Sequence, residues 1–264
     1  MEQITTDVWV ERLDAEGYPT VAAVALTPTR AFVIDTLMRP EDMDSVLALL
    51  AERASERRTV VVNTHHHWDH VYGNAAFPGL DIVAQRACPR LIVAQGVSAA
   101  ESVPLQPPQG VPLPTITFGD RLTYSDEPET VHLIHAPGHS EDSLVVFLSG
   151  ARVLFAGDTL EWPLPSFAQR DGKDAWIHTL RQLKQLPVDV IVPSHGPVMG
   201  REIIDANERY IAGVYEAVAA AKRASVGRHD LDLPATRFLR DGVVLDDVYA
   251  EAHRGNLVWA WDEV

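Results

Sequence analysis

The sequence is poor in cysteine, in positive charge and in long apolar runs, and each scarcity excludes a class of protein. Cys88 is the only cysteine in 264 residues, so there is no intrachain disulfide and no thiolate-rich structural zinc site. Lys and Arg total 22 against 37 Asp and Glu, a formal net charge of −15 that disfavours nucleic acid and anionic membranes as partners. No stretch has the roughly 20 apolar residues that a membrane span needs.

The composition and the first residues indicate an ordinary globular protein. Hydrophobic residues make up 46% and charged residues 22% of the chain, and its length suits one large domain or two small ones. The beginning, MEQITTDVWVERLD, is acidic and lacks the basic and apolar segments of a signal peptide. We therefore expect a cytoplasmic protein.

Hydrophobic periodicity predicts an α/β protein in which strands and helices alternate. The expected strands are 6–12, 20–26, 31–35, 59–63, 82–84, 121–124, 131–135, 144–148, 153–156 and 188–192. The expected helices are 44–54, 89–95, 173–186 and 202–224. An extended loop is expected at 103–114, which holds five prolines, and the tail with Trp259 and Trp261 is expected to dock on the rest.

Segment 65–70, HHHWDH, carries the densest group of metal-binding side chains. In an extended chain, side chains two positions apart share a face, so His65 and His67 can reach one ion together. If a helix follows, Asp69 and His70 project from its first turn and can hold a second ion. Imidazole and carboxylate are the ligands that zinc accepts where no thiolate is offered.

Three apolar strands in the second half of the chain end close to a further candidate ligand. These candidates are His139, Asp158 and His195, and each stands beside Gly or Pro. In α/β sheets the carboxyl ends of strands are the edge where sites assemble. The sequence therefore predicts that all the candidates meet at one sheet edge.

The seven candidates supply enough ligands for two metal ions. A carboxylate has two oxygens, so Asp158 can bridge between the ions. The expected cofactors are two Zn²⁺ ions, although Fe or Mn suits the same ligands. The first predicted set is His65, His67 and His139, and the second is Asp69, His70 and His195.

The order HxHxDH, then Gly-His, then Gly-Asp-Thr, then a final His before Gly resembles the ligand series of the metallo-β-lactamase superfamily over about residues 4–200. This resemblance implies a four-layer αββα sandwich with the metals at one sheet edge. We expect a catalytic domain at 1–200 and a helical C-terminal extension at 201–264, packed on the same domain.

Within that superfamily, segment 64–70 also resembles the metal motif of glyoxalase II. Other segments depart from that enzyme: LEWPLP follows Gly-Asp-Thr in place of Gly-Cys-Gly-Arg, and the last ligand lies in Ser-His-Gly. No basic glutathione-binding signature is recognisable in the C-terminal part. The resemblance therefore carries over the metal ligands and leaves the substrate open.

Several residues near the ligands are candidates for supporting roles. Asp35 ends an apolar strand at a place where the superfamily often has a buried Asp near the site, so the resemblance makes it a candidate for supporting a metal ligand. His66 faces away from its neighbours on an extended chain and is expected to be structural, and Cys88 is expected to be buried and inert. The candidate pocket residues are Tyr18, Tyr72, Trp162 and Phe167, with loops 14–19 and 161–170 as pocket walls.

These features predict a dinuclear zinc hydrolase. A metal-bridging hydroxide would attack the carbonyl carbon of an ester, lactone, thioester or amide in a small-molecule substrate. Asp158 as the bridging ligand and Asp69 as the residue that orients the nucleophile are the predicted catalytic residues.

Two other activities are weighed against this one. A mono-iron dioxygenase of the persulfide dioxygenase type would use only His65, His139 and Asp158 or a similar set. A phosphodiester hydrolase acting on nucleic acid conflicts with the acidic balance of the chain. No nucleic-acid or membrane partner is expected, whereas the proline-rich loop and the aromatic tail are candidate surfaces for a homo-oligomer.

Overall fold

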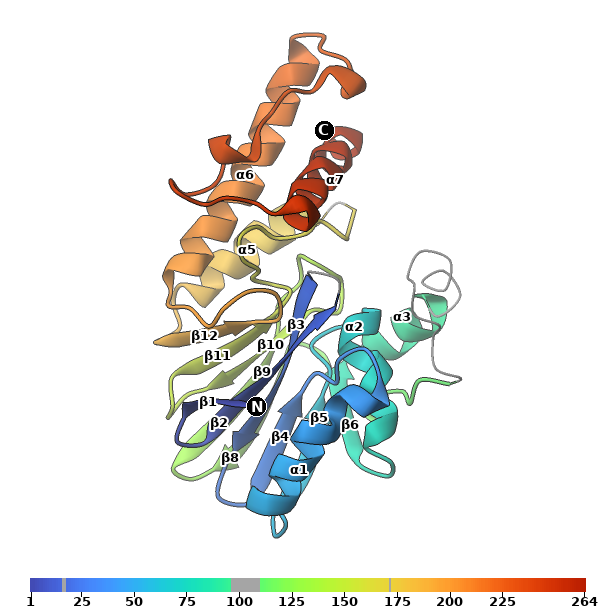
Figure 1. Cartoon of the computed structure of the whole chain (residues 1–264), viewed down its shortest axis with the longest axis vertical. Helices are drawn as coiled ribbons and strands as arrows, with labels where there is room; N and C mark the ends of the chain where they lie inside the picture. The colour runs from blue at the N-terminus through green and yellow to red at the C-terminus, as the bar shows by residue number, and fades with distance from the viewer. Residues whose placement is uncertain (16–17, 96–109, 171) are drawn as a thin grey trace.

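Two β-sheets face each other between layers of helices in the computed structural model, which describes residues 1–15, 18–95, 110–170 and 172–264 (Figure 1). The first sheet has seven strands in the order of the chain. Strands β1 to β4 pair antiparallel, and β4 to β7 pair parallel. Their bounds are β1 (Glu2–Thr5), β2 (Val8–Ala15), β3 (Tyr18–Leu26), β4 (Arg30–Ile34), β5 (Arg58–Val62), β6 (Asp81–Gln85) and β7 (Ile116–Phe118).

The second sheet has five strands in the order β12-β11-β10-β9-β8. Only β11 and β12 run parallel; the other pairs are antiparallel. The parallel pair brings the carboxyl ends of β11 and β12 to the same edge of the sheet. The bounds are β8 (Arg121–Asp126), β9 (Glu129–His135), β10 (Leu144–Leu148), β11 (Val153–Gly157) and β12 (Val190–Pro193).

The core between the sheets follows from the two-residue period of the strands. Along β2, Val8 and Val10 belong to the cluster that contains Val146 and Phe155 of the second sheet. Trp9, between them in sequence, faces the opposite way and packs with the cluster under the outer helices. β10 of the second sheet alternates in the same way, with Val146 in the core between the sheets and Val145 in the cluster under the outer helices, so the inner strands are buried on both faces.

Helices cover both outer faces, which confirms the expected four-layer αββα sandwich. On the first sheet lie α1 (Asp44–Arg53) and α3 (Cys88–Gln95), with the short α2 (Trp68–Val71) at the sheet edge. On the second lie α5 (Lys173–Leu183) and α6 (Glu202–Arg223), and α7 (Asp247–Glu263) packs beside α6. Among the described residues, no helix combines the length and apolarity required to cross a bilayer.

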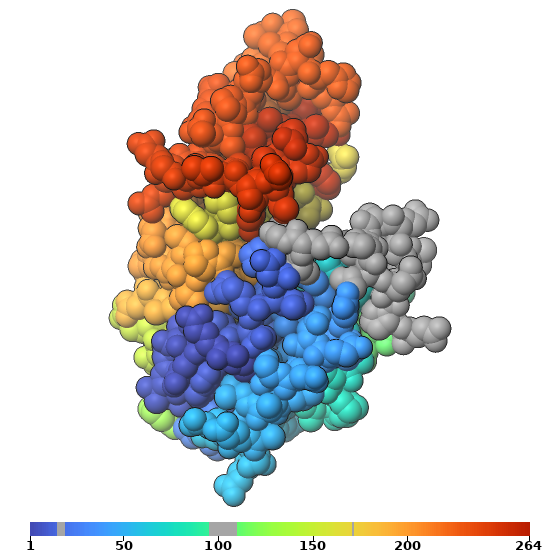
Figure 2. All heavy atoms as spheres, viewed as in Figure 1, coloured from blue at the N-terminus to red at the C-terminus, as the bar shows by residue number. Residues whose placement is uncertain are grey.

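The chain after residue 200 is helical and shares a core with the second sheet. Ile203, Tyr210 and Val214 of α6 and Leu257 of α7 belong to one buried cluster with Leu154 of β11. The segment after residue 200 forms one end of the molecule, drawn in orange and red in Figure 2. A domain boundary at residue 200 stays a prediction.

The sequence reading missed three elements. β1 and β7 are short edge strands of the first sheet, and α7 has only a weak apolar periodicity. Trp259 does dock, since its Nε1 donates to the carbonyl of Gln169 at 3.3 Å. The proline-rich stretch 103–114 is described only from residue 110 onward.

Gly73 lies where only a hydrogen atom fits, because a Cβ there would be 1.8 Å from the carbonyl oxygen of Thr36. We expect Gly73→Ala to lower the free energy of unfolding by about 1–3 kcal/mol in urea denaturation. Gly255→Ala is the matched control: nothing lies within 4 Å of a Cβ there, and it should stabilise α7 by up to about 1 kcal/mol. Similar effects of both substitutions would contradict this packing.

Candidate metal centre

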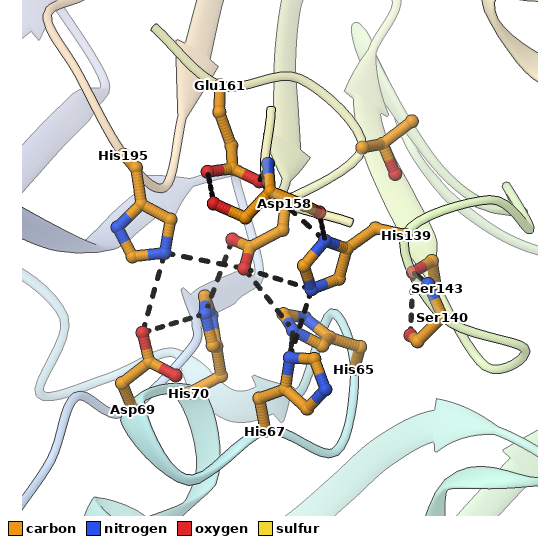
Figure 3. Close-up of polar contacts among 12 residues, drawn as sticks. His65, His67, Asp69, His70, His139, Ser140, Ser143, Asp158, Glu161 and His195 are labelled. Atoms are coloured by element: carbon orange, nitrogen blue, oxygen red, sulfur yellow. Dashed lines mark hydrogen bonds and ion pairs between the residues drawn. The ribbon is translucent and has the colours of Figure 1, made fainter. Parts of the chain in front are cut away.

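All seven predicted ligands lie at one edge of the two sheets, on four separate chain segments (Figure 3). The first segment follows β5 and enters α2, whose first turn carries Asp69 and His70. The others follow β9, β11 and β12, as the strand-end pattern predicted. These ends contribute His139, Asp158 and His195.

The first predicted set surrounds a space of the size that zinc occupies. His67 Nδ1 lies 2.9 Å from His65 Nε2 and 3.0 Å from His139 Nε2. Asp158 Oδ2 lies 3.5 Å from His65 Nε2 and 3.4 Å from His139 Nε2. A tetrahedral zinc ion with Zn–N bonds near 2.0–2.1 Å separates its ligand atoms by about 3.3 Å. The four donor atoms therefore fit one ion.

The second set has the same dimensions. Asp69 Oδ2 lies 3.3 Å from His70 Nε2 and 3.4 Å from His195 Nε2. Asp158 reaches both histidines, with Oδ1 3.3 Å from His70 Nε2 and Oδ2 3.3 Å from His195 Nε2. His70 Nε2 and Asp158 Oδ1 are buried and have no hydrogen-bond partner, which a cation between them would satisfy.

Asp158 lies between the two sets. Its two oxygens contact members of both sets, and Figure 3 shows its carboxylate at the centre of the cluster. Its side chain is buried and follows β11 directly. Bridging of two metal ions by Asp158 stays a prediction.

Four of the histidines turn Nδ1 outward onto an oxygen, which leaves Nε2 to face the cluster. An imidazole N–H donated outward fixes the tautomer and the ring orientation. The oxygens belong to different chain segments, so the fold orients each ring separately. The pairs are His65 with Thr64 Oγ1 at 3.2 Å, His70 with Asp35 Oδ2 at 2.9 Å, His139 with the Ser166 carbonyl at 3.0 Å, and His195 with the Pro19 carbonyl at 2.8 Å.

Asp35 holds His70 from behind, as expected from its place after β4. The backbone N–H and the hydroxyl of Thr64 each donate to its carboxylate at 2.7 Å. Asp35 is buried and has φ +60, a left-handed conformation that aspartate tolerates better than most residues. Asp35 therefore links the loop of the first set to a histidine of the second set.

His66 faces away from the cluster, in agreement with its predicted structural role. Its Nδ1 lies 2.7 Å from Asp142 Oδ1, which also accepts from the hydroxyl of Ser140 at 2.8 Å. Asp142 thereby ties the loop that carries His65 and His67 to the loop that carries His139.

Burial and neighbouring charge shift the cluster's imidazoles in opposite directions. Burial, helped by His139 and His66, lowers the pKa of His67 to about 3, so His67 is neutral and ready to ligate. Burial also acts to lower the pKa of His195, but the carboxylates of Asp158, Glu161 and Asp69 outweigh it and raise the value to about 9. The cluster thus attracts positive charge, which protons supply where no metal ion does.

Glu161 is a buried acid beside the cluster that the sequence reading did not identify. It accepts from the N–H of Ser166 at 2.9 Å and lies 3.6 Å from His139 Nδ1. Burial and the nearby Asp158 raise the pKa of Glu161 to about 8. A single acid in the otherwise apolar segment 160–165 was the only sequence signal for it.

A cavity of about 430 Å³ lies beside His195. Two of its wall residues bond to that histidine: the Pro19 carbonyl accepts from Nδ1, and the Trp162 N–H donates to the His195 carbonyl at 3.0 Å. The remaining described wall comes from the next residues of the same loops and from the segment before and within α7. It consists of Pro163, Gly196, Pro197, Gly242, Val243, Val244, Asp246 and Tyr249.

The four predicted pocket residues do not lie together. Trp162 lines the cavity, whereas Phe167 stacks on Tyr215 at 5.3 Å under α6. Tyr72 is 5% exposed and packs with Cys88 and Ile92, so both of these aromatic rings belong to apolar clusters and not to the cavity wall. The side chain of Tyr18 lies outside the described residues, and its role stays a prediction.

Comparison with known proteins identifies similar sequences and structures. Residues 16–195 match the sequence profile of the Metallo-beta-lactamase superfamily. A linear primary-alkylsulfatase of Pseudomonas sp. (strain ATCC 19151) is 26% identical over 67% of this chain and 42% of its own length. A hydroxyacylglutathione hydrolase of Thermosynechococcus vestitus is 31% identical over 58% of this chain and 54% of its own.

A solved structure supports the fold separately. A metallo-beta-lactamase from Pontibacter korlensis superposes with a TM-score of 0.62 at 23% identity, over 77% of this chain and 94% of its own. At that identity the likeness concerns the fold alone. The chain spans about half the length of the two curated relatives.

Asp35 offers a test of the outward contacts. We expect Asp35→Asn to weaken Zn²⁺ binding about 10-fold or more, because His70 loses the carboxylate that fixes its ring. Competition with a chromogenic chelator measures the affinity. Asp126→Asn is the control. Asp126 is also a buried carboxylate and accepts from the Thr29 N–H at 2.9 Å. It lies at the turn between β8 and β9, at the end of β9 opposite to the one that leads to His139. An equal loss in both variants would refute the specific role of Asp35.

Proposed function

The chain belongs to the metallo-beta-lactamase superfamily, and from that premise we propose that it is a metal-dependent hydrolase with two zinc ions. One observation carries the proposal: donor atoms on four chain segments form two adjoining cages that share Asp158. The hydroxyacylglutathione hydrolase among its relatives supports hydrolysis of a carbonyl compound. The substrate would be a small molecule with an ester, thioester, lactone or amide bond.

The position of each residue in the cluster suggests its role in metal binding or catalysis. His65, His67 and His139 would hold one ion, Asp69, His70 and His195 the other, and Asp158 would bridge them. Bound zinc would lower the pKa of water to about 7 and polarise the scissile carbonyl. Asp69 would orient the attacking water, and the hydroxyl of Thr20 lies 3.4 Å from its Oδ2 and helps to fix its carboxylate.

The complete second set favours this function over a mono-iron dioxygenase, which needs only one set. The formal net charge of −15 disfavours a phosphodiester hydrolase that acts on nucleic acid. Location in the cytoplasm and assembly into a homo-oligomer stay predictions.

The lining of the cavity beside His195 favours a substrate that carries an apolar group. Its described wall includes Pro19, Trp162, Pro197 and Val243 and contains no Lys, Arg or His. The one carboxylate in the wall, Asp246, is engaged as the helix cap of α7. A substrate with an uncharged acyl or alkyl chain suits this wall better than an anionic conjugate does.

A primary alkyl sulfate is the second candidate substrate. The alkylsulfatase relative favours it, and so does the apolar wall, which an alkyl chain would contact. The carbonyl and sulfate candidates share the metal cages and differ in the bond that is cleaved.

Metal content is the direct test of the proposal. The purified chain should hold about two zinc ions, lose hydrolytic activity with a chelator and regain it when Zn²⁺ is restored. Asp158→Ala should lose metal and rate together, because both cages lose their shared ligand; elemental analysis and kinetics measure the two. Full activity of the metal-free chain would exclude the mechanism, and normal metal content of Asp158→Ala would exclude bridging.

A series of p-nitrophenyl esters from acetate to decanoate, with decyl sulfate alongside, tests the cavity. We expect kcat/KM to rise with chain length, and Val243→Asp, at a half-buried residue of the cavity wall, to reduce it roughly 10-fold for the long esters, about the contribution of two buried methylenes. Acetate should change by less than about twofold. Val258→Asp introduces the same charge at an exposed site of α7 away from the cavity wall. An identical profile for both variants would count against this cavity as the substrate site.

A further inference from the structure

We propose that Asn256 of α7 is a positioning residue for the predicted metal ligand His139. The inference rests on the proposed metal centre and adds to it a residue from the C-terminal helices. Asn256 lies beyond residue 195, where the match to the superfamily ends. Its hydrogen bonds among the described residues go to Pro165, Phe167 and Tyr210 and to none of the predicted ligands, so it would act through the backbone around Ser166.

The side-chain amide of Asn256 forms hydrogen bonds with the backbone on both sides of Ser166, a pair of contacts called the grip below. Its Nδ2 donates to the carbonyl of Pro165 at 2.7 Å, and its Oδ1 accepts from the N–H of Phe167 at 2.8 Å. One planar amide thereby meets a backbone acceptor and a backbone donor two residues apart. This pairing fixes the orientation of the peptide groups that flank Ser166.

The Ser166 carbonyl is the group that orients His139. It accepts from His139 Nδ1 at 3.0 Å, so the opposite nitrogen, Nε2, faces His67 and Asp158. A rotation of the Ser166 peptide would remove this acceptor and release the ring. Outer contacts of this kind orient metal-bound histidines and typically change metal affinity 10- to 100-fold when they are removed.

Asn256 is held so that its amide has only one satisfactory orientation. It is 3% exposed, and its Nδ2 also donates to the hydroxyl of Tyr210 at 3.0 Å. That hydroxyl donates in turn to His253 Nδ1 at 2.8 Å, because His253 Nε2 donates to the carbonyl of Leu233 at 2.8 Å. If the amide oxygen and nitrogen exchanged places, the amide NH₂ would face the Phe167 N–H, and the amide oxygen would face the Pro165 carbonyl. Neither pair could form a hydrogen bond.

A second asparagine, from α6, holds the start of the same loop. Asn207 Oδ1 accepts from the N–H of Glu161 at 3.0 Å, and its Nδ2 donates to the Glu161 carbonyl at 2.8 Å. The Glu161 carboxylate in turn accepts from the Ser166 N–H. Both C-terminal helices thus fasten the loop that follows Asp158, and buried amides at each fastening leave little freedom for it.

Zinc affinity of full-length variants tests the role of Asn256. Asn256→Leu removes the grip at similar volume, and we expect Zn²⁺ binding, measured by chelator competition, to weaken 10-fold or more. Asn256→Asp keeps the acceptor for Phe167 but loses the donor to Pro165, so an intermediate loss is expected; it also serves if the leucine variant does not fold. Hydrogen exchange of the Phe167 N–H should become faster in Asn256→Leu, which lacks the acceptor, and should change little in Asn256→Asp, which keeps it.

His253→Leu is the matched control, because it breaks the same buried network on the side away from the loop. It should lower thermal stability while leaving zinc affinity within about twofold of the unsubstituted chain. Equal zinc affinity in Asn256→Leu and His253→Leu would overturn the role of Asn256 and leave the hydrolase proposal standing. An unsubstituted chain that binds no Zn²⁺ would overturn the hydrolase proposal. Unchanged Phe167 exchange in Asn256→Leu would independently refute the contact between Asn256 and this backbone.

Discussion

The structure depends on holding five imidazoles and two carboxylates together with their lone pairs directed at shared points. Donor atoms lie 2.9–3.5 Å apart in the first set, a spacing that is repulsive for neutral imidazoles unless a proton or a cation lies among them. The chain resists this repulsion with bonds to the outer ring nitrogens, from Asp35, Pro19 and Ser166 among others. The hydrogen bonds that hold the fold together at this edge are therefore the same ones that would hold the metal ligands in place.

Close approach of the two sheets at the metal edge makes those bonds available. Gly157 ends β11 with φ +53, and a Cβ there would lie 2.8 Å from the hydroxyl of Thr64. The missing side chain lets Thr64 bond to Asp35 while Asp158 projects into the cluster from the next position. A larger residue would separate the strand end from the loop and the bridging carboxylate from the histidines.

The parts of the site that could be predicted from sequence are those set by local pattern. The ligands share short motifs and strand ends, so their spacing and the resemblance to a known ligand series identified them together, and the resemblance also pointed to Asp35 at the end of a strand. Glu161 and Asn256 carry no such pattern, because each is defined by partners on other segments; Asn256 is 91 residues from Pro165. For the same reason aromatic character alone could not separate Trp162 on the cavity wall from Phe167 in the core.

The helix that grips the Ser166 loop also supplies part of the cavity wall. Tyr249 and Asn256 are seven residues apart in α7, two helical turns, so they share one face of the helix. Tyr249 lines the cavity, and Asn256 holds the loop that orients His139. Any displacement of α7 must therefore alter the cavity wall and the support of the metal cage together. The match to the superfamily ends at residue 195, so α7 joins a segment outside that match to the loop beside the predicted metal centre.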